Sequence, residues 1–127
     1  MSECVIDWTL PIVTISESNV RDHWSKKAAR VRAQRQHIWV QWKNDVETRT
    51  ENIIRSTCVV RLTRISSRSL DDDNLRGALK SCRDGIADCI NPGRPPGQSD
   101  NLPGMRFEYA QEKGKPKEKA VRIQIFC

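Results

Sequence analysis

The sequence Leu70-Asp71-Asp72-Asp73-Asn74-Leu75 lies at the point where a strand is expected to give way to a helix. Residues 57–65 before it are rich in β-branched and apolar side chains, which predicts a strand. Residues 72–90 carry apolar side chains at intervals of three and four, which predicts a helix with one buried stripe. The stripe consists of Leu75, Leu79, Cys82, Ile86 and Cys89. The chain should therefore pass from a strand directly into a helix, at a turn that holds three adjacent carboxylates.

The segments on either side of this unit complete the expected domain. Residues 5–15 predict a first strand, which a proline interrupts and so places at a sheet edge or a bulge. Residues 20–46 show the longest helical pattern, with apolar side chains on one face. That face consists of Trp24, Ala28, Val31, Ile38, Trp42 and Val46. Residues 105–111 and 120–126 predict two strands, and the basic turn at 114–117 predicts that they pair as a hairpin.

The order of these elements indicates the fold class. Residues 91–104, between the second helix and the hairpin, hold four prolines and three glycines, which predicts a loop without regular structure. No internal repeat divides the chain. We therefore expect one domain over residues 1–127 in the α+β class. It should consist of a small mixed β-sheet with two main helices packed on one face.

The composition restricts the classes of protein to which the chain can belong. Its 127 residues are 37% hydrophobic and 30% charged, which suits a single folded core. No apolar stretch approaches the roughly 20 residues that a membrane-spanning helix needs, and the N-terminus lacks the pattern of a signal peptide. The five cysteines are scattered without a Cys-x-x-Cys pair, which favours a reducing compartment. We therefore expect a cytoplasmic protein without a membrane partner.

The positive charge is unevenly distributed along the sequence. The formal net charge is +6, which by itself only hints at a polyanionic partner. Between residues 21 and 35, however, six Lys and Arg residues accompany a single Asp, a local net charge of +5. The predicted helix over residues 20–46 therefore carries a basic surface, which either contacts a polyanion or is simply solvated.

The three adjacent carboxylates allow two interpretations. They repel one another, and a divalent cation with a preference for oxygen ligands, such as Mg²⁺, removes that repulsion. If the turn is extended, Asp71 and Asp73 point the same way and can hold one or two ions. Asp is equally favoured as a helix N-cap, however, and capping alone explains one or two of these residues. Both interpretations predict that the acidic residues lie at the start of the helix.

A polar stripe continues from these carboxylates along the predicted helix. Lys80 and Asp84 follow Asp73 by seven and eleven residues, which returns both to within about 20° of its direction around the helix axis. The stripe is either a solvated Lys–Asp pair or an arrangement that brings an ammonium group near a phosphate.

These residues resemble the RusA family of Holliday junction resolvases, which bacteriophages and prophages typically encode. The hallmark of that family is Asp-x-Asp-Asn-Leu at the start of a helix, present here as residues 71–75. The family helix then carries a Lys and, four residues later, an Asp, as Lys80 and Asp84 do. A later family carboxylate corresponds to Asp100. The chain departs from the pattern at Gly77, where the family has its Lys, and at Asp100, which is single where the family usually has an Asp-Asp pair.

The resemblance implies a Mg²⁺-dependent homodimeric endonuclease that nicks two strands of a four-way DNA junction in a bacterial or phage-infected cell, with Mn²⁺ as the alternative cofactor. Asp71, Asp73 and Asp100 would hold the metal, and Lys80 would stabilise charge on the phosphate. Asn74 and Asp84 are candidates to support this set. Seven basic residues would contact backbone phosphates: Arg21, Lys26, Lys27, Arg30, Lys113, Lys115 and Lys117.

Two other functions remain open at this point. Gly77 and the single Asp100 motivate a RusA-fold protein that binds branched DNA without cleaving it. The capping interpretation motivates a generic interaction domain, which would show no preference for a junction over a duplex.

Overall fold

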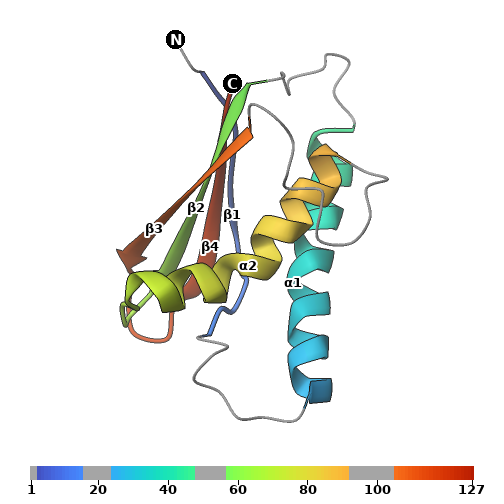
Figure 1. Cartoon of the computed structure of the whole chain (residues 1–127). Helices are drawn as coiled ribbons and strands as arrows, with labels where there is room; N and C mark the ends of the chain where they lie inside the picture. Colours follow the sequence, from blue (N-terminus) through green and yellow to red (C-terminus); the bar gives the residue numbers. More distant parts are fainter. Residues whose placement is uncertain (1–2, 16–23, 48–56, 92–104) are drawn as a thin grey trace.

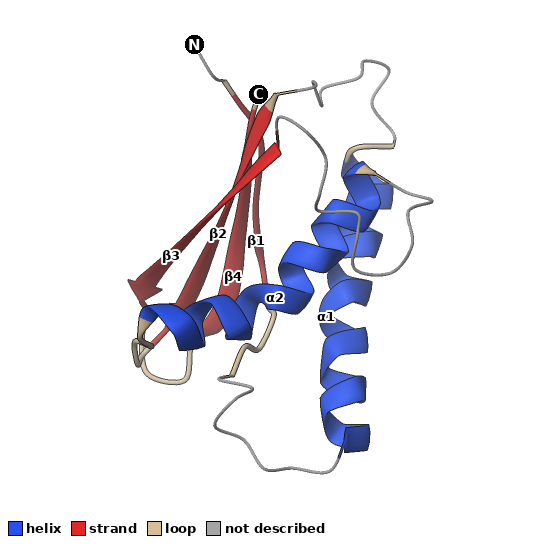
Figure 2. Ribbon diagram, viewed as in Figure 1, coloured by secondary structure: helices blue, strands red, loops and turns tan. Residues whose placement is uncertain are grey.

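The described residues form four strands and two helices in two layers (Figure 1). A computed structural model describes residues 3–15, 24–47, 57–91 and 105–127. In chain order the elements are β1 (Cys4–Leu10), α1 (Trp24–Asp45), β2 (Cys58–Ser66), α2 (Asp72–Ile90), β3 (Met105–Lys113) and β4 (Lys119–Phe126). One layer is the sheet, and both helices lie on the same side of it (Figure 2). The prediction of a small α+β domain with a mixed sheet and two helices is therefore confirmed.

The sheet has the strand order β1-β4-β2-β3. β4 is antiparallel to both of its neighbours, whereas β2 and β3 are parallel and are joined through α2. The prediction that the last two strands pair as a hairpin is wrong, because β2 lies between them. The backbone N–H of Gly114 donates to the carbonyl of Ser66 at 3.0 Å, so the turn after β3 passes over the end of β2. This order places the apolar strand β2 in the interior of the sheet, where both of its edges are paired.

The apolar stripe of α2 packs onto the sheet as predicted. Leu75, Leu79, Cys82 and Ile86 are buried, and they join Val60 and Leu62 of β2 and Ile123 and Ile125 of β4 in one core. Cys89 is partly buried against the same core. Truncation of a buried leucine such as Leu79 to alanine costs about 2–5 kcal/mol, so this stripe is a principal source of stability.

Only the C-terminal half of α1 belongs to the core. Ile38 and Trp42 are buried, and Trp42 makes an edge-on contact with Trp8 of β1, with ring centroids 6.4 Å apart. Trp24 at the start of the helix is 76% exposed, so its expected place on the buried face is wrong. The buried residue nearer that end is Gln34, whose side chain donates to the carbonyl of Val13 at 2.6 Å. The first turns of α1 extend beyond the sheet (Figure 1), so their apolar side chains find no core.

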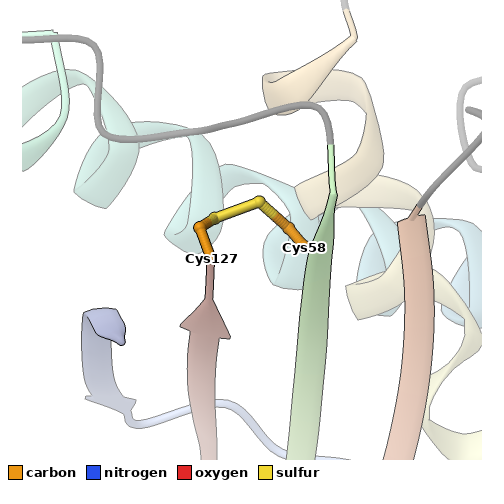
Figure 3. The surroundings of a disulfide bond; sticks show 2 residues. All are labelled: Cys58 and Cys127. Carbon is orange, nitrogen blue, oxygen red and sulfur yellow. A yellow bond between two sulfur atoms is a disulfide. The ribbon is translucent and has the colours of Figure 1, made fainter. Parts of the chain in front are cut away.

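A disulfide joins Cys58 at the start of β2 to Cys127 after β4 (Figure 3). The two cysteines are 69 residues apart in the sequence, and their spacing indicated no such pair. Burial raises the pKa of the Cys82 and Cys89 thiols to about 12, which removes both from reactive thiol chemistry at neutral pH. Neither described helix combines the length and the apolar composition of a membrane-spanning segment.

Candidate functional site

The loop between β2 and α2 lies at the carboxyl ends of the two parallel strands. β2 ends at Ser66, α2 begins at Asp72, and β3 ends beside them at Lys113. Where parallel strands meet a helix in an open sheet, ligands bind outside the carboxyl ends of the strands. The run of three carboxylates therefore lies at the edge of the sheet that is best suited to a ligand.

Gln111 of β3 holds the loop just before the first carboxylate. Its side-chain oxygen accepts from the backbone N–H of Leu70 at 2.9 Å, and its side-chain N–H donates to the carbonyl of Leu70 at 2.6 Å. One amide thus satisfies both backbone groups of Leu70, which constrains the chain immediately before Asp71.

Arg64 of β2 holds the other part of the same loop. Its Nη1 donates to the carbonyl of Arg68 at 2.6 Å, and its Nε donates to the hydroxyl of Thr14 at 3.0 Å. Arg64 is only 7% exposed, and this desolvation lowers the pKa of its guanidinium. A buried guanidinium that makes these two contacts fixes the position of the loop relative to both β2 and the segment after β1.

Asp71 is the N-cap of α2. Its Oδ1 accepts from the backbone N–H of Asn74 at 2.9 Å, and its own backbone is extended, with φ −70° and ψ 169°. The capping interpretation is therefore confirmed for this residue. Because the helix already begins at Asp72, the extended turn that would align Asp71 and Asp73 is absent. Asp72 and Asp73 are instead exposed in the first turn, where the helix dipole stabilises negative charge.

Asp84 connects the polar stripe of α2 to α1. Its Oδ2 lies 3.1 Å from Nζ of Lys80 and 3.4 Å from Nη2 of Arg35, and its side chain is 15% exposed. The Lys80 side chain is 72% exposed and lies about 10 Å farther along the helix axis than Asp73. The Lys–Asp pair of the stripe is thus present, and Lys80 points to solvent from it.

Gly77 lies between Asp73 and Lys80 and leaves a hollow on the surface. A Cβ added at Gly77 would meet no atom within 4 Å. The hollow is a cavity of about 320 Å³ lined by residues 76–77, 80, 83–84 and 109. Space for a side chain therefore exists at the position where the RusA pattern has its lysine.

Two arginines of α2 pack on aromatic rings of β3, a feature that the sequence analysis missed. The guanidinium of Arg83 lies 4.5 Å from the ring of Phe107 and donates to the hydroxyl of Tyr109 at 2.7 Å. The guanidinium of Arg76 lies 5.4 Å from the ring of Tyr109. The signal for this packing was the alternation of β3, which places both rings on the face that α2 covers.

The structure brings together only some of the predicted site residues. Asp71, Asp73 and Asn74 lie at the start of α2, and Lys113 lies at the adjacent end of β3. Lys115 and Lys117 are exposed in the turn that follows, whereas Lys26, Lys27 and Arg30 lie on the first turns of α1. Arg21 and Asp100 fall outside the described residues.

The described carboxylates do not form a complete set of metal ligands. Within residues 3–15, 24–47, 57–91 and 105–127, no three His, Cys, Asp or Glu side chains are arranged to hold a metal ion. Asp71 uses one carboxylate oxygen for the cap, so its second oxygen and the exposed carboxylates of Asp72 and Asp73 are open to a cation from solvent.

Comparison of the chain with protein-family models, with curated proteins and with solved structures finds no match.

Proposed function

We propose that the chain is a Mg²⁺-dependent, structure-specific endodeoxyribonuclease that resolves four-way DNA junctions as a homodimer, by metal-assisted hydrolysis of a phosphodiester. The observation that carries this proposal is the position of Asp71 and Asp73. Asp71 is the N-cap of α2 and Asp73 lies in its exposed first turn, at the carboxyl ends of two parallel strands. The loop directly before them is held by Gln111 and Arg64.

The two carboxylates suit Mg²⁺, and Mn²⁺ as its substitute. Mg²⁺ is usually bound through one or two carboxylates together with waters and substrate phosphates. Asp71 and Asp73 supply that number, and we assign Asp100 as a third ligand. When bound, the cation would neutralise charge on the phosphate and activate the attacking water.

The basic residues of the predicted site would hold the DNA. Lys80 is exposed beyond its pair with Asp84, so its flexible side chain can turn toward a phosphate that lies above the first turns of α2. Lys113, Lys115 and Lys117 extend from the end of β3 into the turn beside the same loop, where they would contact the backbone of the DNA. The basic first turns of α1 would contact a second part of the junction.

A second candidate is a RusA-fold protein that binds branched DNA without cleaving it. The observation that favours it is that two side chains with proposed catalytic roles already have hydrogen-bond partners. Asp71 already caps α2, and Lys80 is already paired with Asp84. With glycine at position 77, no other lysine stands closer to Asp73 on this face of α2.

The deciding experiment is cleavage of a synthetic four-way junction in Mg²⁺ and in Mn²⁺. We expect symmetric nicks from the wild type. Asp73→Asn should abolish cleavage and retain binding, whereas Asp88→Asn should retain both, because Asp88 is an exposed carboxylate on the same helix, remote from the loop. Binding without cleavage in either metal would favour the second candidate. Equal affinity for junction and duplex at low salt would contradict both.

A further inference from the structure

A polar pocket lies beside the carboxylates and is separate from them. It has a volume of about 240 Å³ and is lined by loop residues 66–69 and by residues 111–113 at the end of β3. The lining residues carry three serine hydroxyls, one guanidinium, one ammonium, one amide and one carboxylate, from Ser66, Ser67, Arg68, Ser69, Gln111, Glu112 and Lys113. Pockets for small molecules usually exceed about 300 Å³, so this one suits a single small polar group better than a whole cofactor.

Contacts from three residues outside the loop hold the backbone that lines the pocket. Arg64 fixes the carbonyl of Arg68 at 2.6 Å, and Gln111 fixes both backbone groups of Leu70. The backbone N–H of Gly114 donates to the carbonyl of Ser66 at 3.0 Å and fixes the other side of the loop. A loop held at three points loses little conformational entropy when a ligand enters, which favours binding.

The charge of the pocket favours an anion. Gln111 and Lys113 lie on the face of β3 that carries α2, whereas Glu112 alternates to the other face, opposite Ile65 of β2. Glu112 nevertheless belongs to the lining, so Arg68, Lys113 and Glu112 together leave a net charge of +1 beside the three serine hydroxyls. A guanidinium, an ammonium and hydroxyl donors are the groups that bind phosphate oxygens.

We propose that this pocket binds one non-scissile phosphate of the DNA strand through Arg68, Lys113 and the serine hydroxyls, and so determines which phosphodiester reaches Asp71 and Asp73. This inference rests on the proposed nuclease function. Ser69 precedes Asp71 by two residues, which span at most about 7 Å. At a rise of about 3.4 Å per nucleotide, the bound phosphate would lie within about two nucleotides of the cleaved one.

Binding measurements test the pocket without requiring cleavage. In the Asp73→Asn background, Arg68→Ala should weaken junction binding about tenfold, the effect of one charge-assisted hydrogen bond. It should also reduce the slope of log K against log salt by about 0.9, as expected for the loss of one phosphate contact. The matched control is Arg106→Ala, which removes the same charge from an exposed residue at the opposite end of β3.

The position of the phosphate is tested by its chemical neutralisation. Junctions with a single methylphosphonate at each of the three phosphates on either side of the cut should show one position at which the Asp73→Asn protein loses affinity. At that position the Arg68→Ala variant should lose none. Identical behaviour of Arg68→Ala and Arg106→Ala on all substrates would overturn the pocket and leave the nuclease intact. Wild-type protein that binds no junction at all would overturn the nuclease as well.

Discussion

Gln111 and Leu70 are 41 residues apart in the sequence and are joined by two hydrogen bonds, at 2.9 and 2.6 Å. Through them the end of β3 determines where α2 begins, because Leu70 directly precedes the N-cap residue Asp71. The geometry of the carboxylates is thus set by the sheet and not by the helix alone. Gln111 acts on the proposed metal ligands through the backbone, as a positioning residue.

Replacement of Gln111 by leucine should weaken both the fold and metal binding. The change removes two exposed hydrogen bonds to the backbone of Leu70, and a typical hydrogen bond contributes about 0.5–1.5 kcal/mol of stability. It also frees the loop, so the Mg²⁺ concentration for half-maximal cleavage should rise several-fold. Urea unfolding and a Mg²⁺ titration measure the two effects. Gln36→Leu, at an exposed position on α1, is the control. An unchanged Mg²⁺ requirement in Gln111→Leu would show that the clamp serves stability alone.

Loss of the disulfide between Cys58 and Cys127 should lower the stability of the protein substantially. The bond closes a loop of 69 residues, for which the chain-entropy relation gives about 4 kcal/mol at 25 °C. We expect Cys127→Ala, or reduction of the wild type, to shift the midpoint of urea unfolding to lower urea. Cys4→Ala replaces an exposed free cysteine and should leave the midpoint unchanged. An unchanged midpoint after reduction of the wild type would contradict a stabilising role for this disulfide.

The pair of Asp7 and Arg122 on the open face of the sheet should make stability depend on pH. Arg122 donates to both carboxylate oxygens of Asp7, at 2.9 and 2.7 Å, and these hydrogen bonds hold the pKa of Asp7 below its ordinary value of 3.8. A pKa that is lower in the folded state stabilises the protein above the unfolded value, and the effect disappears as the pH falls through the folded value.

Unfolding free energies of the wild type and of Asp7→Asn should therefore differ at pH 6 and converge below pH 4. The same comparison in an Arg122→Gln background provides the control, because the pair is already broken there. A difference that stays constant from pH 6 to pH 2 would contradict the assignment of the pair.

Local features of the fold could be predicted from the sequence, and non-local ones could not. The bounds of α2 follow from an apolar stripe and an acidic N-cap, both of which act within one helix. The hairpin was wrong because a short turn between two strands does not show whether a third strand lies between them. The prediction of the buried face of α1 was correct only for the C-terminal half of the helix. The apolar pattern at Trp24 does not reveal that the sheet ends before the first turns of α1.

The same limit applies to the candidate site. The carboxylates and their capping role are local and could be predicted. Arg64 and Gln111 were missed because they hold the loop through its backbone groups. No sequence motif indicates contacts of this kind. One signal was available. Both residues continue the two-residue repeat that places buried or partly buried side chains on the inner face of β2 and β3. A polar side chain that faces a core needs a partner there, so such positions indicate a structural contact.

Gly77 provides the sharpest test of how the site acts. Gly77→Ala should stabilise α2 by about 1 kcal/mol, since glycine is a poor helix former and the added Cβ meets no atom within 4 Å. Gly77→Lys fits the same space and places an ammonium group one turn after Asp73. Cleavage of the junction should then become faster and less dependent on Lys80, because the new charge stands closer to the phosphate. Gly77→Gln, which has similar length and no charge, separates this effect from helix stabilisation. Equal cleavage rates for the Lys and Gln variants would show that an ammonium group at position 77 does not contribute to the reaction.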